Sequence, residues 1–195
     1  TVTPGATVAI VSGDSPILSK GYGYADVDAD VPVNADETAF RVGSVGKLVT
    51  YTAVMQGVER RILDLDADVN SYLSESTVRI PETYDEPVTL GHLGTHTAGF
   101  ESTLDPDIAA DPDGIDPLET VLEAQTRRRI RPPGELVGYS NYGAALAGHV
   151  VAEVNETTFE EYVRSEIFEP LGMTHSTFAQ PIPAAQAGHP AAPHV

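Results

Sequence analysis

Four polar side chains, at two places far apart in the sequence, have the types and spacing that acyl transfer requires. Ser44 precedes Lys47 by about one helical turn, and Tyr139 and Asn141 form a Tyr-x-Asn pair well downstream. Residues i and i+3 are neighbours on a helix surface, so the Lys47 amine can approach the Ser44 hydroxyl. The pattern predicts a nucleophilic serine that is activated without a His/Asp pair.

The expected roles of these residues follow from their ordinary chemistry. A serine in the first turn of a helix lies near free N–H groups and the positive end of the helix dipole, which favour an alkoxide and supply one oxyanion donor. Lysine titrates near 10.4 and tyrosine near 10, so a base at neutral pH needs a lowered pKa. Tyr139 is the expected proton carrier if Lys47 stays charged, and Asn141 would hold Lys47 or a substrate carbonyl.

Strands are predicted in the N-terminal part of the chain, ahead of Ser44. Residues 6–12 and 17–24 are short apolar or alternating runs separated by the turn cluster 13–16, so they predict a β-hairpin. A third short strand is expected to end at residues 40–42. An amphipathic helix should then start near residue 45 and end near residue 60, where two arginines favour a helix C-terminus.

Helices and loops are predicted beyond this first helix. Helical patterns cover residues 89–95, 117–128, 141–154 and 158–168, while 105–116 is an acidic Pro/Gly loop and 181–193 is rich in Ala and Pro. We expect one incomplete catalytic domain over residues 1–195. It would comprise N-terminal strands in 1–43, a mainly helical region carrying both motifs in 44–180, and the Ala/Pro-rich end in 181–195.

Composition and charge narrow the partners that this chain can have. The chain has 195 residues, 41% of them apolar, which is enough for one core. Its apolar runs are too short to span a bilayer, and its start has no signal-peptide pattern. A net charge of −18 from 29 acidic and 11 basic residues argues against a nucleic-acid partner and predicts a halophile's surface. The absence of cysteine excludes disulfides and thiolate catalysis.

Several segments resemble one family of enzymes. Residues 40–47 (FRVGSVGK) and 134–143 (GELVGYSNYG) resemble the nucleophile segment and second motif of the penicillin-recognising serine hydrolases. Within that family they are similar to the group of class C β-lactamases, D-alanyl-D-alanine carboxypeptidases and esterases. Residues 93–100 (LGTHTAGF) and 170–173 (PLGM) are similar to two further stretches of the same group, so the resemblance covers nearly the whole chain.

The resemblance implies a fold, a reaction and a role for each candidate residue. The fold would be α/β (α+β), with a helical region packed on an antiparallel sheet. Ser44 would be the acylated nucleophile, Lys47 its partner, Tyr139 the general base and Asn141 a substrate contact. The substrate would be a small molecule or peptide with an amide or ester carbonyl, no metal or organic cofactor would be required, and the location would be extracellular or on the cell surface.

The family's third motif, a Lys or His followed by any residue and Gly, has no counterpart after residues 170–173. His92, with Leu93 and Gly94, matches its letters but lies in a segment that resembles another part of the family. We therefore expect the chain to be part of a longer protein. Its C-terminal strands, or a second chain, would complete the sheet and supply the third motif and the second oxyanion donor.

Other readings of the sequence point to different chemistry. His92 and His96 have the i, i+4 spacing of a zinc-dependent hydrolase, but the catalytic Glu after the first His is absent, so we expect structural histidines. Residues 64–75 place oxygen ligands as in a calcium loop, but Val69 stands where that loop requires Gly. A non-catalytic relative that binds a ligand or peptide in the cleft is the main alternative to an enzyme.

Overall fold

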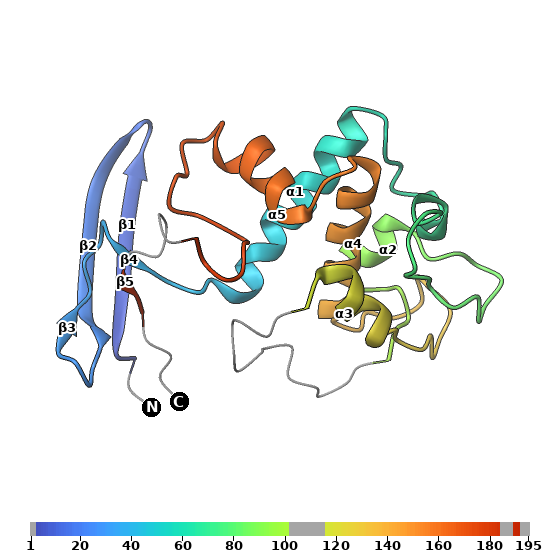
Figure 1. Ribbon diagram of the computed structural model, residues 1–195, viewed down its shortest axis with the longest axis horizontal. Helices are drawn as coiled ribbons and strands as arrows, with labels where there is room; N and C mark the ends of the chain where they lie inside the picture. Colours follow the sequence, from blue (N-terminus) through green and yellow to red (C-terminus); the bar gives the residue numbers. More distant parts are fainter. Residues whose placement is uncertain (1–2, 102–115, 184–188, 192–195) are drawn as a thin grey trace. The chain divides into compact units, whose positions relative to one another are not determined.

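The computed structural model describes residues 3–101, 116–183 and 189–191 (Figure 1). The chain divides into two units, one made of Thr1–Gly43 with Ile182–Val195 and the other of Ser44–Pro181. Of the loop expected at 105–116, all but the last residue lies outside the described residues, as does part of the Ala/Pro-rich end.

A β-hairpin forms the first part of the chain, as its alternating pattern predicts. Strand β1 (Gly5–Ser12) pairs antiparallel with β2 (Ser15–Asp26). Gly13 in the turn has a φ of +57°, a conformation that glycine adopts without steric cost. A two-residue strand that the sequence did not predict, β3 (Val31–Pro32), pairs with the other edge of β2 (Figure 1).

The same unit contains a second, very small sheet. Strand β4 (Thr38–Ala39) pairs in parallel with β5 (His189–Pro190), so a late segment of the chain returns to the N-terminal region. The predicted third strand is therefore present, slightly earlier than expected. Within the described residues, β1 has β2 as its only neighbour. Large apolar side chains of the hairpin are exposed to solvent, among them Ile10, Val11 and Ile17.

The second unit is helical, as predicted. Its helices are α1 (Gly46–Glu59), α2 (Leu90–Gly94), α3 (Leu118–Ala124), α4 (Asn141–Val154) and α5 (Phe159–Val163), which continues into a π-helical turn at Arg164–Phe168. Short 3₁₀ turns lie at Gly43–Val45 and Val69–Tyr72. None of the described helices combines the length and the apolar character that crossing a bilayer would require.

Capping side chains set the starts of three of these helices. Thr89, Ser140 and Thr158 each accept a backbone N–H from the first turn of α2, α4 and α5, which satisfies donors that a helix start leaves unpaired. Helix α3 is shorter than predicted. The Thr126 hydroxyl donates to the carbonyl oxygens of Leu122 and Glu123, which occupies acceptors at its C-terminal end.

Helix α4 lies at the centre of the helical unit and contacts α1, α2, α3 and α5 (Figure 1). Its side chains Leu146, Ala147, Val150 and Val151 have no exposed surface. Each fully buried valine or leucine stabilises the fold by about 1.5–3 kcal/mol. The central position of α4 matters for function because its first residues carry the second motif.

The apolar face predicted for α1, with residues 45, 48, 49, 53 and 55, is only partly correct, since Ala53 is buried and Val49 packs against the core. Leu48 and Met55 are 71% and 49% exposed, whereas the buried positions are Thr50, Ala53, Val54 and Gly57. A Cβ at Gly57 would lie 2.6 Å from a side-chain carbon of Leu63, so this side of α1 needs small residues for close packing. The buried face therefore follows residue size rather than hydrophobicity.

Candidate active site

Ser44 lies in the 3₁₀ turn that leads directly into α1. Gly43 before it has a φ of +54°, which glycine accepts easily and which turns the chain into the helix. Lys47 follows in the first turn of α1, and its Nζ donates to Ser44 Oγ at 3.2 Å. Ser44 is exposed and Lys47 half-buried. The nucleophile and cation proposed from the sequence are therefore within hydrogen-bond distance.

Tyr139 and Asn141 come from the segment that starts α4. Ser140 between them caps this helix, since its Oγ accepts the N–H of Gly143 at 2.9 Å. The Tyr139 hydroxyl is 2.6 Å from Ser44 Oγ, and Lys47 Nζ donates to Asn141 Oδ1 at 2.7 Å. The structure thus brings together all four residues that the sequence singles out, from two helix starts that are distant in sequence.

The electrostatics of this cluster favour a reactive tyrosine. The hydrogen bond to Lys47, and then that to Ser44, lower the pKa of Tyr139 from its ordinary value of 10.0. Lys47 Nζ also lies 4.9 Å from the centre of the Tyr139 ring, within the range of a cation–π contact. A phenol with a lowered pKa is a better proton acceptor near neutral pH than an ordinary tyrosine.

His96 is a residue near this cluster whose role the sequence did not reveal. Its ring centre is 4.5 Å from that of Tyr139, and its Nδ1 accepts the backbone N–H of Ser140 at 3.2 Å. Burial, and then the charge of Lys47, lower the pKa of His96. The available signal was the place of His96 in residues 93–100, a segment selected only because it resembles the family.

His92 forms a local cap and does not contact His96 in a metal-like arrangement. Its Nδ1 accepts the N–H of Thr89 while its own N–H donates to the Thr89 hydroxyl, a reciprocal cap at the start of α2. Within the described ranges, no group of three or more His, Asp or Glu side chains could hold a metal ion. The letters that match the third motif, His92 to Gly94, belong to α2 and not to a strand.

In residues 64–75, the segment that resembles a calcium loop, polar side chains form hydrogen bonds with the backbone. Asp64 and Asp68 each accept a backbone N–H two residues further on. The Asn70 side chain donates to the carbonyl of Ile80 and accepts its N–H. These contacts stabilise two turns and join residue 70 to residue 80, which is a structural role for these polar positions.

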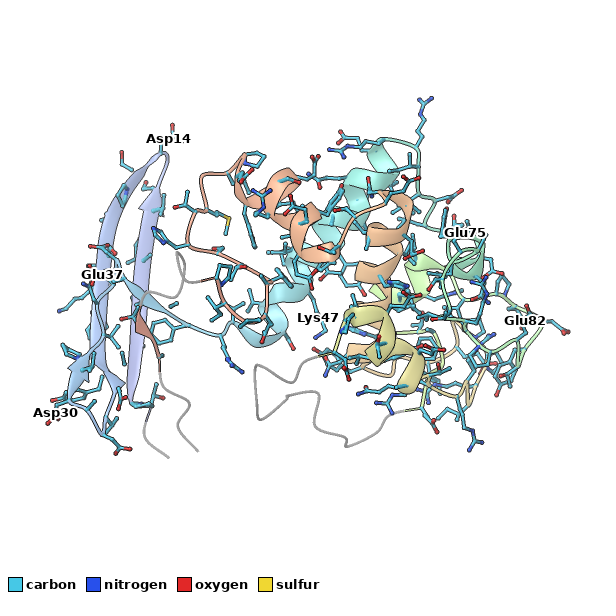
Figure 2. All side chains as sticks on the ribbon, viewed as in Figure 1. Asp14, Asp30, Glu37, Lys47, Glu75 and Glu82 are labelled. Atoms are coloured by element: carbon cyan, nitrogen blue, oxygen red, sulfur yellow. The ribbon has the colours of Figure 1, made fainter. Side chains whose placement is uncertain are left out.

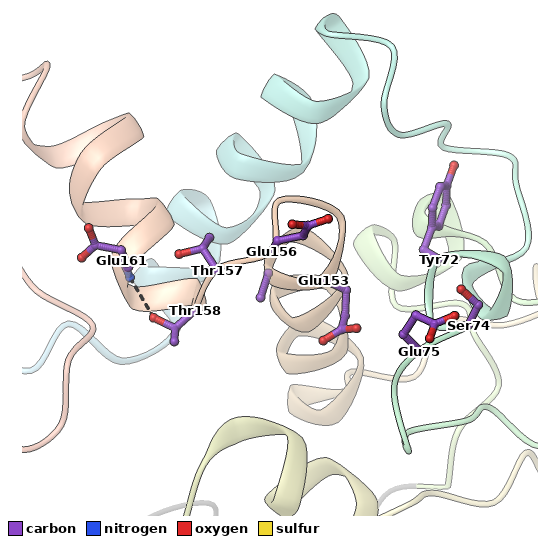
Figure 3. Close-up of a pocket in the computed structure, with 9 residues that line it drawn as sticks. Tyr72, Ser74, Glu75, Glu153, Glu156, Thr157, Thr158 and Glu161 are labelled. Carbon is purple, nitrogen blue, oxygen red and sulfur yellow. Dashed lines mark hydrogen bonds between the residues drawn. The ribbon is translucent and has the colours of Figure 1, made fainter.

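A hollow of about 680 Å³ lies elsewhere in the helical unit, between the Val69–Tyr72 turn and the end of α4 (Figure 3). Four glutamates line it, Glu75, Glu153, Glu156 and Glu161. Its lining residues include no lysine, histidine or cysteine, and Figure 3 shows the carboxylates spread around the hollow. A serine hydroxyl within hydrogen-bond distance of both a tyrosine and a lysine is therefore found at Ser44 and not among the residues that line this hollow.

Comparisons with known proteins agree on one family. The model of the family described as Beta-lactamase matches residues 1–193. Over 172 residues the chain is 30% identical to the "Putative penicillin-binding protein PbpX" of Bacillus subtilis (strain 168), covering 88% of this chain and 41% of that protein.

Solved structures give the same result. The octameric penicillin-binding protein homologue from Pyrococcus abyssi is similar with a TM-score of 0.71 and 31% identity, over 88% of this chain and 40% of that one. EstCE1, described as a hydrolase with promiscuous acyltransferase activity, has a TM-score of 0.71 and 28% identity, over 87% and 47%. The chain spans less than half the length of each of these relatives.

Proposed function

Because the chain belongs to the β-lactamase family, we propose that it carries the acylation site of a serine hydrolase that acts on an amide or ester carbonyl. The observation that carries this proposal is the position of Ser44 Oγ, 2.6 Å from the Tyr139 hydroxyl and 3.2 Å from Lys47 Nζ. A nucleophile, a proton acceptor with a lowered pKa and a cation within hydrogen-bond distance are what covalent acyl transfer needs.

The proposed reaction has two steps. The Tyr139 phenolate takes the proton of Ser44 while Ser44 Oγ bonds to the carbonyl carbon, and the tetrahedral intermediate then expels an amine or alcohol that receives this proton. Tyr139 then takes a proton from water as the water oxygen bonds to the ester carbonyl carbon, and the intermediate releases the acid and expels Ser44, whose oxygen receives that proton from Tyr139. Lys47 stabilises the phenolate through its hydrogen bond to Tyr139.

Asn141 is the proposed substrate contact and also orients the cation. Its Oδ1 accepts from Lys47 Nζ at 2.7 Å, which directs the ammonium towards Ser44 and Tyr139. A side-chain amide at a helix start beside the nucleophile has the chemistry to bind a substrate carbonyl. Candidate substrates are a β-lactam, a D-amino-acid peptide or a simple ester.

We also propose that residues 1–195 form one catalytic domain, whose sheet is completed by a further segment or a second chain. Support comes from the coverage of the relatives, each of which is more than twice as long as the matched part. Within the described residues the outer edge of β1 has no paired strand, and Ile10 and Val11 near it are 48% and 65% exposed. Such an edge ordinarily pairs with another strand.

Covalent labelling tests the proposal. The whole protein, in molar salt, should react with a fluorophosphonate or a penicillin, and peptide mapping should place the label on Ser44. The Ser44→Ala variant should take no label, whereas Ser74→Ala, which removes an exposed serine hydroxyl outside the site, should label as the wild type does. Label on another residue, or undiminished labelling of Ser44→Ala, would refute the assignment.

A further inference from the structure

His96 makes three separate contacts with three consecutive residues around Tyr139. Its carbonyl oxygen accepts the N–H of Gly138 at 2.8 Å, and its ring Nδ1 accepts the N–H of Ser140 at 3.2 Å. Between these hydrogen bonds its ring lies against Tyr139, with ring centres 4.5 Å apart and planes tilted by 38°. The two amides that flank Tyr139 are thus held by one residue.

His96 adopts an unusual backbone conformation to make these contacts. Its φ is +58°, in the left-handed region that costs a residue with a Cβ about 1 kcal/mol or more. Two backbone hydrogen bonds support this conformation. The His96 N–H donates to the carbonyl of Leu93 in α2 at 3.2 Å, and the His96 carbonyl accepts the N–H of Gly138. It directs the carbonyl and the ring of His96 to the same neighbouring segment.

The hydrogen bond from Ser140 also fixes the protonation state that His96 needs. Nδ1 can accept an N–H only when it carries no proton, so the working form is the neutral ring with its proton on Nε2. Burial and the nearby charge of Lys47 lower the pKa of His96, which keeps this form dominant at neutral pH. A protonated His96 would lose the bond to Ser140 and add a second cation beside Tyr139.

The effect of His96 reaches the other site residues through Ser140. The Ser140 side chain caps α4 by accepting the N–H of Gly143. Asn141, whose side-chain oxygen accepts a hydrogen bond from Lys47, is the first residue of that helix. A shift of Ser140 would therefore move Tyr139 and the start of α4 together. A hydroxyl–hydroxyl distance of 2.6 Å between Ser44 and Tyr139 leaves little tolerance for such a shift.

We propose that His96 is a positioning residue that holds the Tyr139 hydroxyl in line with Ser44 by fixing the backbone on both sides of Tyr139. This inference rests on the proposed function, because it assumes that Tyr139 exchanges a proton with Ser44. His96 touches neither Ser44 Oγ nor the reacting carbonyl in this scheme, and it acts only through Tyr139.

Two substitutions separate the parts of this role. His96→Gly accepts the positive φ but removes the ring and its acceptor. His96→Asn also tolerates the positive φ and keeps an acceptor oxygen near the place of Nδ1, while it removes the stacked ring. The matched control is His175→Asn, which replaces an exposed histidine in the same unit.

The measurement is the rate at which a fluorophosphonate phosphonylates Ser44 in the whole protein, a step in which Ser44 loses its proton, its oxygen bonds to phosphorus and fluoride leaves. His96→Gly should slow this labelling about 10²-fold, as expected when a reacting group is displaced by about 1 Å. His96→Asn should slow it less, by about 10-fold, and His175→Asn should not change it. The same His96 substitutions in a Tyr139→Phe background should cost less than about 3-fold, because the group that His96 positions is already gone.

The outcomes distinguish this inference from the proposed function. If the wild type takes no label on Ser44, the proposed function fails and this inference fails with it. If Ser44 is labelled at wild-type rate in His96→Gly, or if the cost is the same with and without the Tyr139 hydroxyl, the positioning role alone is refuted. If His96→Gly does not fold, the comparison of His96→Asn in the two backgrounds decides the question in the same way.

Discussion

Among the described residues of the helical unit, the side-chain hydroxyls of two serines are hydrogen-bonded to titratable side chains, and their surroundings differ completely. Ser44 is exposed, and its Oγ contacts a tyrosine and a lysine. Ser76 is 9% exposed, and its Oγ contacts His149 Nε2 at 2.8 Å and Glu119 at 2.9 Å. On residue types alone, the Ser76 cluster looks more like a hydrolase triad than the Ser44 cluster does.

The difference shows that access and hydrogen-bond capacity decide reactivity. Ser76 Oγ also accepts the N–H of Val78 at 3.1 Å, so its lone pairs and its proton are engaged. In a catalytic triad the carboxylate orients the histidine, whereas here Glu119 binds the serine hydroxyl together with the N–H and hydroxyl of Thr77. The Ser76 cluster ties a loop to α3 and α4, and the Ser44 cluster leaves an exposed oxygen beside a proton acceptor.

Among the changes that test this comparison, removal of the Tyr139 hydroxyl should have the largest effect, and that effect should be on the turnover rate. Tyr139→Phe should slow turnover of an activated ester by about 10² to 10⁴, the usual contribution of a general base, because Ser44 then loses its proton acceptor. The melting temperature should stay close to that of the wild type, since the exposed Tyr139 hydroxyl contributes little to the core. Near-normal turnover in the variant would remove Tyr139 from the mechanism.

The corresponding change at the buried serine should affect stability and leave the chemistry unchanged. Ser76→Ala leaves the Val78 N–H and a buried histidine without their partner, which should cost about 1–3 kcal/mol of unfolding free energy. Urea unfolding measures the cost, and the exposed Ser74→Ala should stay within about 0.5 kcal/mol of the wild type. Fluorophosphonate labelling of folded Ser76→Ala should match the wild type, and a lost label would show that the two clusters are coupled.

The buried Ser76 cluster should also differ from the Ser44 cluster in making the stability of the fold depend on pH, through His149. Burial lowers the pKa of His149 below its ordinary value of 6.5, against the opposing charges of Glu153 and then Glu119. The folded state therefore disfavours the protonated ring more than the unfolded state does. Stability should be fully present above about pH 6.5 and should decrease as the pH falls through 6.5 towards the lowered pKa.

Comparison of variants checks this assignment. In urea unfolding between about pH 7 and pH 5, His149→Gln should show a smaller loss of stability than the wild type. The pKa of His92 and His96 is lowered as well, so part of the loss should remain in that variant. His175→Gln, at an exposed position, serves as the control. An unchanged slope in His149→Gln would mean that the histidine is not the group that titrates.

Local features of the structure could be predicted from the sequence because their causes are local. The hairpin, α2 and the extent of α4 are confirmed, and each has a nearby turn glycine or capping side chain. The proximity of Ser44 and Lys47 is likewise a property of one helical turn. The two-residue strand β3 is too short to show a period, and it was missed.

Features that depend on packing could not be predicted in the same way. The exposure of Leu48 and the burial of Gly57 follow from the close approach of neighbouring segments, which a count of apolar positions does not contain. The contact of Tyr139 with Ser44 joins two helix starts that are distant in sequence, so it was expected from residue chemistry and from the family resemblance but not from any local pattern. The contacts of His96 require a positive φ, which is uncommon for any residue except glycine, so a histidine at this position does not predict it.

A change in salt concentration should have the smallest effect on stability among these tests. It should change the repulsion between exposed charges more than the hydrogen bonds of the buried Ser76 cluster. The acidic side chains are spread over both units, as Asp14, Asp30 and Glu37 on one and Glu75 and Glu82 on the other illustrate (Figure 2). At about 0.1 M salt the screening length is about 10 Å, so these charges repel one another, and at about 1 M it falls to about 3 Å. A net charge of −18 makes this repulsion a destabilising contribution of the folded state.

Raising salt from about 0.1 to about 2 M should therefore raise the melting temperature of the whole protein, with most of the screening complete by about 1 M. A further rise beyond that point would indicate the specific salt requirement of a halophile. The loss of stability in Ser76→Ala should be the same at both salt concentrations, because buried hydrogen bonds are screened little. A flat or falling melting temperature in the wild type would contradict the prediction that surface repulsion limits stability, and would leave the −18 charge without a role in the fold.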